Sequence, residues 1–333
     1  MTRVAINGLG RIGRAALKQV LDEPALELVA LNDLAPADNL AYLLKYDTVY
    51  GRYGRDVACE EGHLVIGGTH YPLFSESDPA RLSWREKRVD VVLECTGAFT
   101  SREGLSKHLE AGARHAILSA PSKAAEVLPV VSGVNTPQQR PQVISCASCT
   151  TNCIAPVVEV LNRGIGVRKA AMTTVHAYTS SQSIVDAPAK RVERGRSGAA
   201  NLVPTSTGAA KATARVLPEL EGIFDGAAIR APVAIGSIAD ITFLTSRATS
   251  VDEINQLFVD ESGSERYREI LGVSHDPMVS SDIIGDPRAS VVDLTRTQVI
   301  DGDLVKVMSW YDNEWGFTRQ MIREVLAFAA QGG

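Results

Sequence analysis

A glycine-rich turn near the N-terminus constrains the fold of this chain more than any other feature. Gly8, Gly10 and Gly13 are spaced as G-x-G-x-x-G, directly after a strand-like run at 2–7 and before a helical stretch that continues to about residue 21. In this arrangement the first two glycines permit a tight turn and close approach of a phosphate, and the third lets the helix pack on the strand. With the apolar run that follows, the pattern predicts a βαβ unit that binds a dinucleotide, with the pyrophosphate at the helix N-terminus.

Asp33 strengthens this prediction. It lies about twenty residues beyond Gly13, which is the spacing expected for a carboxylate that binds the adenosine ribose diol. The same carboxylate would repel a 2′-phosphate, so it favours NAD over NADP as the cofactor. The alternative is a βαβ unit that serves only as part of a core, because the glycine pattern alone occurs often by chance.

Size and composition set the broad class of protein. The chain has 333 residues, which predicts two domains. Its formal net charge of −5 disfavours a protein that holds nucleic acid through overall basicity. Because it has neither a signal-peptide layout nor a membrane-length apolar run, we expect a cytoplasmic protein. Its cysteines, five in all with three of them between residues 146 and 153, form a poor disulfide framework and fit a reducing compartment.

Strand and helix patterns alternate through the first part of the chain. They comprise hairpin-like segments at 57–73, a buried strand at 90–95, a helix at about 101–112 and a strand at 115–119. Such alternation predicts an α/β architecture, with a Rossmann-type doubly wound parallel sheet that binds ligands at the carboxyl ends of its strands. Thr96, Gly97 and Ser119 lie at such ends and are either cofactor contacts or parts of ordinary turns.

The pattern changes after Ser145. Longer β-rich runs appear at 168–177, 227–246 and 291–311, which predict an α+β domain with a largely antiparallel sheet. We therefore expect a cofactor domain at 1–148 and a catalytic domain at 149–313. The final stretch, 314–333, has helical spacing and is expected to pack back on the first domain.

Cys149 is the strongest candidate for a catalytic residue, because it precedes an apolar helix predicted at 154–161. The dipole and the free N–H groups of a helix N-terminus favour a thiolate, so we expect the pKa of Cys149 to be lowered. His176, in a later strand, is a candidate base, although a lone strand histidine is more often structural. Cys146 and Cys149 also form C-x-x-C, which leaves a redox dithiol as an alternative. No second Cys/His pair follows, so we expect no metal site.

Two further segments have the composition of anion sites. Thr207 and Gly208 precede a predicted helix, which suits either phosphate binding or a simple N-cap. A basic stretch at 190–196 lies within a long irregular segment, 178–203. Most basic stretches are only solvated, but long loops inside compact domains are usually functional.

Six segments spread along the chain together carry a family resemblance. They are residues 6–14, 32–33, 147–153, 174–179, 206–211 and 310–314. Taken together they closely resemble phosphorylating glyceraldehyde-3-phosphate dehydrogenases, and the resemblance covers essentially the whole chain. The segment Ala147-Ser-Cys149-Thr-Thr-Asn-Cys153 is the most specific of the six, and is shared with the related erythrose-4-phosphate dehydrogenases.

The resemblance implies a role for each matching residue, with Cys149 as the nucleophile and His176 as its activator and the base for hydride transfer. It implies that the substrate's phosphate is bound by Thr179 and Arg230. It implies that the attacking phosphate is bound by Ser148, Thr150, Arg196, Thr207 and Gly208. It implies that NAD is held by Arg11, Ile12, Asp33, Ser119 and Asn313, with Asn313 on the nicotinamide amide. The other expected NAD contacts come from the turn and the strand end, namely Gly8, Gly10, Gly13, Thr96 and Gly97.

The implied activity is the phosphorylating oxidation of D-glyceraldehyde 3-phosphate to 1,3-bisphosphoglycerate with NAD, through a Cys149 thioester. The loop 178–203 resembles the family's S-shaped loop, which implies a homotetramer. The rival activity is the hydrolytic erythrose-4-phosphate dehydrogenase. A second rival is a noncatalytic NAD-binding sensor or RNA-binding protein, which would need no nucleophile.

The chain departs from the family pattern at several positions. Ser180-Ser181 stands where the family usually has Asn-Asp, and Cys146 stands where it commonly has Asn. Ala231-Pro232-Val233 replaces Val-Pro-Thr, and Trp315-Gly316-Phe317 is similar to the erythrose-4-phosphate branch. None of these departures affects Cys149 or His176.

Overall fold

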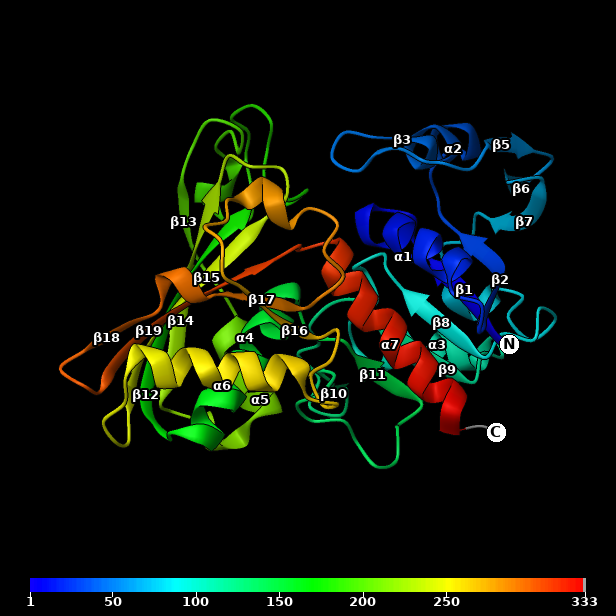
Figure 1. Ribbon diagram of the computed structural model, residues 1–333. Helices are drawn as coiled ribbons and strands as arrows, with labels where there is room; N and C mark the ends of the chain where they lie inside the picture. Colours follow the sequence, from blue (N-terminus) through cyan, green and yellow to red (C-terminus); the bar gives the residue numbers. More distant parts are fainter. Residues whose placement is uncertain (332–333) are drawn as a thin grey trace. The chain divides into compact units, whose positions relative to one another are not determined.

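The chain divides into two compact units in the structure, a computed structural model that describes residues 1–331 (Figure 1). The first unit comprises Met1–Val130, Pro137–Ala147 and the chain from Thr318 onward; the second comprises Val131–Thr136 and Ser148–Phe317. The division between Ala147 and Ser148 lies one residue before the expected boundary at 148/149, and residues 131–136 and 314–317 group with the second unit. Residues 332–333 of the expected C-terminal helix lie outside the described residues.

A nine-stranded sheet forms the centre of the first unit, in the order β10-β11-β9-β8-β1-β2-β7-β6-β5. Its strands are β1 (Thr2–Asn7), β2 (Leu26–Asn32), β5 (Val57–Glu60), β6 (His63–Ile66), β7 (Thr69–Phe74), β8 (Val91–Glu94), β9 (His115–Leu118), β10 (Leu128–Pro129) and β11 (Val143–Ser145). Strands β10 to β7 pair in parallel, and β6 and β5 continue the sheet antiparallel. The predicted Rossmann-type parallel sheet is confirmed.

The strand order reverses between β1 and β8, because the chain runs outward from β1 to β2 and β7 before it returns to β8 on the other side. Ligands of doubly wound sheets bind at the carboxyl ends of the strands at such a point. The strands there are apolar and buried, as expected of a parallel sheet covered on both faces.

The helices of this unit are α1 (Arg11–Asp22), α2 (Ala37–Lys45), α3 (Arg102–Glu110) and most of α7 (Trp315–Gln331). A two-stranded ribbon, β3 (Tyr46–Asp47) and β4 (Gly51–Arg52), follows α2. Leu105 of α3 packs against Ala116 and Leu118 of β9. Figure 1 shows α7, in red, running past β8, β9 and β11, and its Phe328 ring lies 4.3 Å from the His115 ring of β9.

The second unit contains an eight-stranded mixed sheet in the order β13-β14-β12-β15-β19-β17-β16, with β18 paired to β19. Its strands are β12 (Val167–Ala177), β13 (Val203–Ser206), β14 (Phe224–Ala231), β15 (Ser237–Thr245), β16 (Leu271–Ser274), β17 (Ser290–Asp293), β18 (Gln298–Ile300) and β19 (Leu304–Tyr311). The pairs β12–β14 and β16–β17 are parallel and the others antiparallel. The expected runs at 227–246 and 291–311 are therefore each divided into separate strands.

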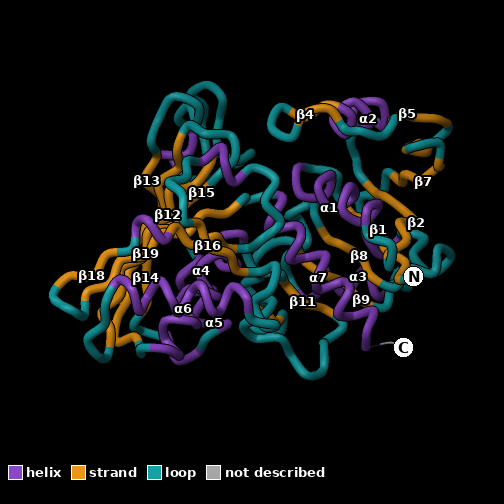
Figure 2. The backbone as a smooth tube through the Cα atoms, viewed as in Figure 1, coloured by secondary structure: helices purple, strands orange, loops and turns teal. Residues whose placement is uncertain are grey.

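Three helices cover one face of this sheet: α4 (Cys149–Gly164), α5 (Ala209–Val216) and α6 (Val251–Gly263). They gather together beside the strands in Figure 2. Short 3₁₀ helices occur at η1 (Pro79–Arg81), η2 (Val192–Gly195), η3 (Pro218–Leu220), η4 (Ser280–Ile283) and η5 (Leu294–Arg296). None of the helices within residues 1–331 has the length and apolar character of a membrane span.

Candidate active site

A cavity of about 420 Å³ lies at the switch point of the first unit. It is lined by Asn7, Gly8, Gly10, Asn32, Asp33, Leu34, Glu76, Ser77, Cys95, Thr96, Ala98 and Phe99. Four of the predicted cofactor residues are among these, namely Gly8, Gly10, Asp33 and Thr96. The N-cap of α1 is Gly10, whose lack of a side chain leaves the first N–H groups of the helix available to an anion.

The glycines of the turn have the spatial roles that the sequence predicts. Gly8 has a φ of 94°, and a Cβ added there would lie 2.7 Å from the Thr96 amide nitrogen. A Cβ at Gly13 would lie 1.8 Å from the Gly8 carbonyl oxygen, so only glycine lets α1 begin this close to β1. Gly10 has no neighbouring atom within 4 Å of the added Cβ, which leaves the space into which a phosphate would fit.

Two polar residues stabilise the turn. The Asp33 carboxylate accepts hydrogen bonds from the amides of Leu9 (2.6 Å) and Ala35 (2.8 Å) at the edge of the cavity. Arg11, the first residue of α1, forms an ion pair of 2.6 Å with Asp47. Asp33 therefore both holds the turn and presents its charge to a ligand.

Three other predicted cofactor residues of this unit, Ile12, Gly97 and Ser119, lie outside the lining of the cavity. Ile12 lies in the first turn of α1. Gly97, with a φ of 73°, follows Thr96. Ser119 follows β9, and its side chain hydrogen-bonds the Cys95 thiol, whose pKa burial raises to about 12. Ile12 and Gly97 lie within two residues of cavity-lining residues in the sequence, and Ser119 contacts the lining residue Cys95, but none of the three lines the cavity itself.

Cys149 is the first residue of α4, as predicted, although the helix begins five residues earlier than expected. Ser148 is the N-cap, and its hydroxyl oxygen accepts a hydrogen bond of 3.0 Å from the Thr151 amide. Ala147 precedes it with a φ of 56°, a conformation that non-glycine residues seldom adopt. This sharp turn places the thiol at the N-terminal end of the helix.

The expected lowering of the Cys149 pKa is wrong for the free chain. Burial raises the pKa of this thiol, and the guanidinium of Arg230 and hydrogen bonds from Thr150 offset the shift only in part. The N–H groups of the helix N-terminus are present, but they stabilise the thiolate by less free energy than it loses on removal from water.

His176 lies in β12 with its Nε2 atom 3.4 Å from Cys149 Sγ. Burial and the positive charges of Arg230 and Arg194 lower the pKa of this imidazole to about 3. The histidine is therefore neutral at physiological pH, which is the protonation state required of a base. The structure brings the two predicted catalytic residues into direct contact.

Arg230 occupies the other side of the imidazole, because Arg230 and His176 are register partners in the parallel pair β12–β14. Its Nη1 atom lies 2.5 Å from His176 Nδ1 and donates to the Ala177 carbonyl at 2.9 Å. A guanidinium only donates, so the contact with Arg230 needs the tautomer in which Nδ1 accepts and Nε2 carries the proton. Nε2 can accept a proton from Cys149 only in the other tautomer, in which Nδ1–H donates to Ala177, at 2.7 Å.

Tyr311 was not predicted as a functional residue, yet it holds the catalytic pair in place. Its buried hydroxyl lies 3.0 Å from Thr150 Oγ1 on α4 and 2.8 Å from Thr174 Oγ1 on β12. The helix that carries Cys149 is thereby attached to the strand that carries His176. The Thr150 hydroxyl, a predicted phosphate ligand, is used in this link.

Asn313 connects to the same region. Its Oδ1 atom accepts a hydrogen bond of 3.0 Å from Ser237 Oγ, which itself accepts from the Ala177 amide at 3.1 Å. The predicted nicotinamide ligand is thus two hydrogen bonds away from the backbone beside His176.

Arg194, rather than Arg196, faces the catalytic residues. Arg196 is exposed and paired with Asp186 at 2.7 Å. Arg194 lies in η2, where its Nε donates to Thr205 Oγ1 at 3.2 Å and its Nη1 to Ser181 Oγ at 3.4 Å. Its charge acts on both Arg230 and His176.

Thr179 joins this group, since its hydroxyl lies 2.9 Å from Ser181 Oγ. Thr207 and Gly208 follow β13 and precede α5; the Ala209 amide donates to Thr207 Oγ1 at 3.1 Å. Gly208 is the N-cap and has no side chain to cap the helix. The N-cap and the anion-binding interpretations of this segment therefore both remain compatible with its geometry.

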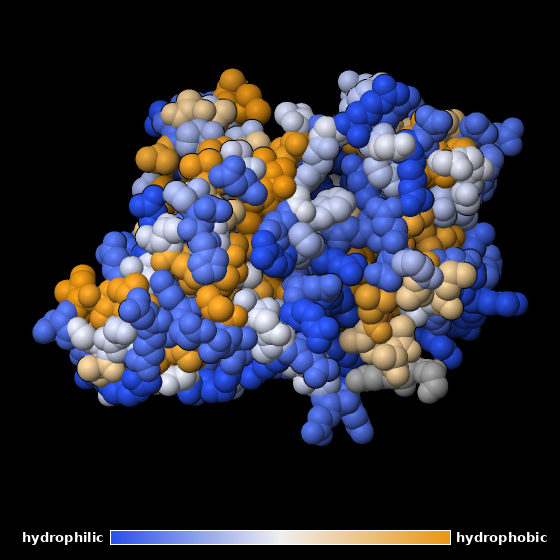
Figure 3. Space-filling view, viewed as in Figure 1, coloured by the Kyte–Doolittle hydropathy of each residue, from blue (hydrophilic) through white to orange (hydrophobic). Residues whose placement is uncertain are grey.

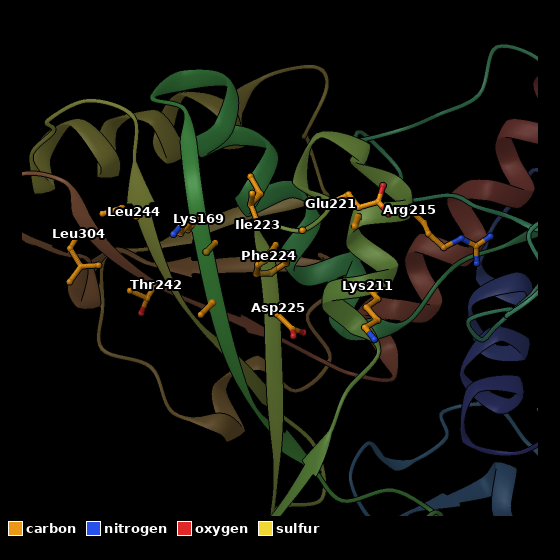
Figure 4. Close-up of a pocket in the computed structure, with 14 residues that line it drawn as sticks. Lys169, Lys211, Arg215, Glu221, Ile223, Phe224, Asp225, Thr242, Leu244 and Leu304 are labelled. Atoms are coloured by element: carbon orange, nitrogen blue, oxygen red, sulfur yellow. The ribbon is translucent and has the colours of Figure 1, made fainter.

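Another cavity of the second unit, about 1210 Å³, contains none of these residues. Figure 4 shows that it is lined by side chains of β12, β14 and α5, such as Lys169, Asp225 and Lys211. It offers no nucleophile beside a base, so it is not the candidate active site.

A dinucleotide cavity in one unit and a thiol–imidazole pair in the other define the class of protein as a dehydrogenase that forms a covalent thiol intermediate. Comparison with known proteins agrees with this class. Residues 2–102 match the NAD binding domain of glyceraldehyde 3-phosphate dehydrogenase, and residues 148–313 match its C-terminal domain. Among the described residues, no group of His, Cys, Asp or Glu has the arrangement of a metal site.

Full-length relatives extend the comparison. The chain is 44% identical over 336 residues to glyceraldehyde-3-phosphate dehydrogenase of Clostridium pasteurianum, covering 99% of both chains. It is 44% identical over 334 residues to that of Geobacillus stearothermophilus and 43% over 334 residues to glyceraldehyde-3-phosphate dehydrogenase 1 of Bacillus subtilis, again with 99% of both chains covered. The chain belongs to the glyceraldehyde-3-phosphate dehydrogenase family and is an NAD-dependent dehydrogenase.

Proposed function

We propose that this chain catalyses the phosphorylating oxidation of D-glyceraldehyde 3-phosphate to 1,3-bisphosphoglycerate, in glycolysis or in the reverse direction. The observation that carries the proposal is the 3.4 Å contact between Cys149 Sγ and His176 Nε2, with Arg230 on the opposite side of the imidazole. A noncatalytic sensor or RNA-binding protein has no need of this pair.

In the first step the Cys149 thiol passes its proton to His176, its sulfur attacks the aldehyde carbon, and His176 returns the proton to the former carbonyl oxygen to give a hemithioacetal. His176 then takes the proton of the hemithioacetal hydroxyl. Bound NAD would supply the hydride acceptor, and loss of hydride from the hemithioacetal carbon leaves a thioester on Cys149. Inorganic phosphate attacks the thioester, and the acyl phosphate and the Cys149 thiolate separate.

Arg230 couples substrate binding to this chemistry. When Nδ1 accepts from Arg230 Nη1, 2.5 Å away, the imidazole has no free lone pair at Nε2. A substrate phosphate bound by Thr179 and Arg230 draws the guanidinium away from Nδ1. The Nδ1–H tautomer can then form, and Nε2 becomes the base for Cys149.

The attacking phosphate requires a second anion site. We assign it to Ser148 and Thr150 at the start of α4, and to Thr207 and Gly208 before α5, with Arg194 as its cation. Arg194 and the Thr207 segment are linked through β13, because Arg194 Nε bonds to Thr205 Oγ1. Hydroxyl, amide and guanidinium donors together suit a dianion.

A steady-state assay tests the proposal. NADH formation from glyceraldehyde 3-phosphate is measured with inorganic phosphate removed and then restored, beside erythrose 4-phosphate at the same concentration. We expect turnover with phosphate only, and a preference for the three-carbon aldehyde. Cys149→Ser is the control for covalent catalysis and should lower kcat at least about a thousandfold. Phosphate-independent turnover, or a preference for the four-carbon aldehyde, would assign the chain to the hydrolytic branch.

The preference for NAD over NADP is proposed from Asp33. Its carboxylate lines the cavity, where a 2′-phosphate on the adenosine ribose would meet its negative charge. A cytoplasmic location is proposed because all five cysteines are free thiols.

A homotetramer is proposed from two exposed apolar surfaces of the second unit. The sheet face opposite α4 is only half-buried, and its register partners Val175, Ile238 and Trp310 form an apolar row across β12, β15 and β19. In the loop 178–203, Ile184 is 79% exposed and Val192 83%. Figure 3 shows orange, hydrophobic side chains at the end of the unit that carries this loop. Exposed apolar surface of this extent is typical of interfaces.

A further inference from the structure

The buried carboxylate of Glu94 has no part in the chemistry described above. Glu94 ends β8 and is 0% exposed. Within residues 1–331 its carboxylate is paired with neither a lysine nor an arginine, and its ionisable neighbour is His108, whose Nε2 atom lies 3.0 Å from Oε2. A buried charge without a cationic partner is costly unless hydrogen bonds satisfy it, so its retention needs an explanation.

Four donors converge on this carboxylate. Oε2 accepts from Asn7 Nδ2 at 2.6 Å and from His108 Nε2. Oε1 accepts from the Thr96 amide at 2.8 Å and from the Thr96 hydroxyl. An ionised carboxylate has about four lone-pair sites and no proton to donate, so Glu94 is fully satisfied as an acceptor.

The protonation of His108 follows from the same geometry. Trp84 Nε1, which only donates, lies 3.1 Å from His108 Nδ1. Nδ1 is therefore the acceptor, and the imidazole is neutral with its proton on Nε2, directed at Glu94. Every hydrogen bond of this network thus points toward one carboxylate.

The network reaches the cavity of the first unit through two of its members. Asn7 and Thr96 both line the cavity, whereas Glu94, His108 and Trp84 do not. Asn7 Oδ1 also accepts from Asn32 Nδ2 at 2.7 Å, which links the carboxyl end of β1 to that of β2. The turns after β1 and β8 are in direct contact, as the close approach of Gly8 to Thr96 demonstrates.

We propose that Glu94 is a positioning residue for NAD: its carboxylate holds Asn7 and Thr96, and through them the two adjoining turns that line the dinucleotide cavity. The inference rests on the NAD site proposed above. It predicts that loss of the acceptor at Glu94 weakens NAD binding while the chemistry at Cys149, in the other unit, continues at saturating cofactor.

Glu94→Gln tests the proposal, because it keeps the shape of the side chain but replaces an acceptor oxygen by an NH₂ donor. The two groups that donated to the replaced oxygen then face an NH₂ donor instead of an acceptor. We expect the Kd for NAD, measured by calorimetry, to rise about tenfold, and the KM for NAD to rise with it, while kcat changes less than about twofold. The second substitution Asn7→Asp should restore part of the affinity in the double variant, since the new amide can donate to the new carboxylate.

Glu159→Gln is the matched control. Glu159 is a buried carboxylate of α4 that accepts from Tyr267 at 2.7 Å, in the second unit. The substitution should lower stability without changing the Kd for NAD. Equal effects of the two variants on this Kd, or a folded Glu94→Gln protein with unchanged Kd, would overturn the proposal.

His108 provides a second test if Glu94→Gln does not fold, because His108 does not line the cavity. His108→Gln can accept from Trp84 and still donate to Glu94, so it should bind NAD normally. His108→Leu removes one donor from Glu94 and should raise the Kd severalfold; if it folds and binds NAD as tightly as His108→Gln, the proposal is wrong. Calorimetry needs no turnover, so a wild-type chain that binds NAD but fails the phosphate assay would contradict the proposed function and leave this inference standing.

Discussion

Cys149 and His176 form a neutral pair in the resting chain, not a thiolate and an imidazolium. Burial raises the pKa of the thiol and lowers that of the imidazole. Arg230 stabilises the thiolate but disfavours the imidazolium, since its positive charge acts on both residues. Under the proposed mechanism the nucleophile is therefore generated during turnover, when a phosphate engages Arg230, rather than stored in advance.

Arg230→Gln should slow the alkylation of Cys149 by iodoacetamide at neutral pH. Arg230 lowers the pKa of the thiol, so its removal should shift the alkylation midpoint to higher pH. The pH profile of alkylation measures the shift. Arg168→Gln, which removes an exposed arginine of β12 paired with Asp303, is the control and should not move the midpoint. An unchanged midpoint in Arg230→Gln would show that this cation does not act on Cys149.

His176 should also make the fold sensitive to acid. Its pKa is about 3 in the folded chain, below the ordinary value of 6.5. Between these values the unfolded chain binds more protons, so stability falls as pH decreases from 6.5 toward 3. At pH 5 the protonation of His176 in the unfolded chain lowers the free energy of unfolding by about 2 kcal/mol. Urea unfolding at pH 7 and pH 5 should show that His176→Asn loses less stability on acidification than the wild type; equal losses would contradict the assigned pKa.

The elements around the cofactor cavity have the bounds that the sequence predicts to within one or two residues. The signals for β1, α1 and β2 are local, because glycine spacing and apolar periodicity act over a few residues. Within the turn, the two glycines differ in their surroundings. Gly13 is packed against the Gly8 carbonyl, and Gly10 faces open space.

Substitution of Gly13 and of Gly10 distinguishes the packing of α1 on β1 from the approach of a ligand to the turn. Gly13→Ala should destabilise the first unit by several kcal/mol or prevent its folding, because the new Cβ overlaps the Gly8 carbonyl oxygen. Gly10→Ala should fold with a melting temperature close to wild type but bind NAD more weakly. Thermal unfolding and NAD titration of both variants check this prediction. A stable Gly13→Ala protein would contradict the close packing of α1 on β1.

Other features could not be predicted because they depend on distant parts of the chain. Arg194, and not Arg196, is the arginine that faces inward. The 3₁₀ helix η2 directs alternate side chains of this basic stretch to different sides. Tyr311 follows Thr150 by more than 150 residues, so no local pattern reveals their contact. Desolvation of Cys149 likewise depends on the packing of the whole second unit. A sequence pattern that marks the start of a helix carries no information on that packing.

The sheet face opposite α4 determines how the whole molecule is expected to assemble. Ala171 is exposed on this face, among half-buried residues of β12, β15 and β19. We expect a wild-type mass of about four times 35.6 kDa by light scattering. Ala171→Glu should reduce the mass at least twofold, because an interface cannot bury the unpaired charge.

Ala58→Glu is the control for this substitution, since it places the same charge on an exposed strand of the first unit, β5. It should leave the mass unchanged. A monomeric wild type, or an Ala171→Glu variant of undiminished mass, would contradict assembly through this face.

The position of α7 in the sequence affects the order in which the two units can fold during synthesis on the ribosome. The strands of the first unit emerge early, but α7, which contributes buried Met321, Ile322 and Val325, emerges last. A nascent chain must therefore keep part of a hydrophobic sheet uncovered while nearly all of the second unit is synthesised. The unit that carries Cys149 can therefore fold before α7 completes the first unit.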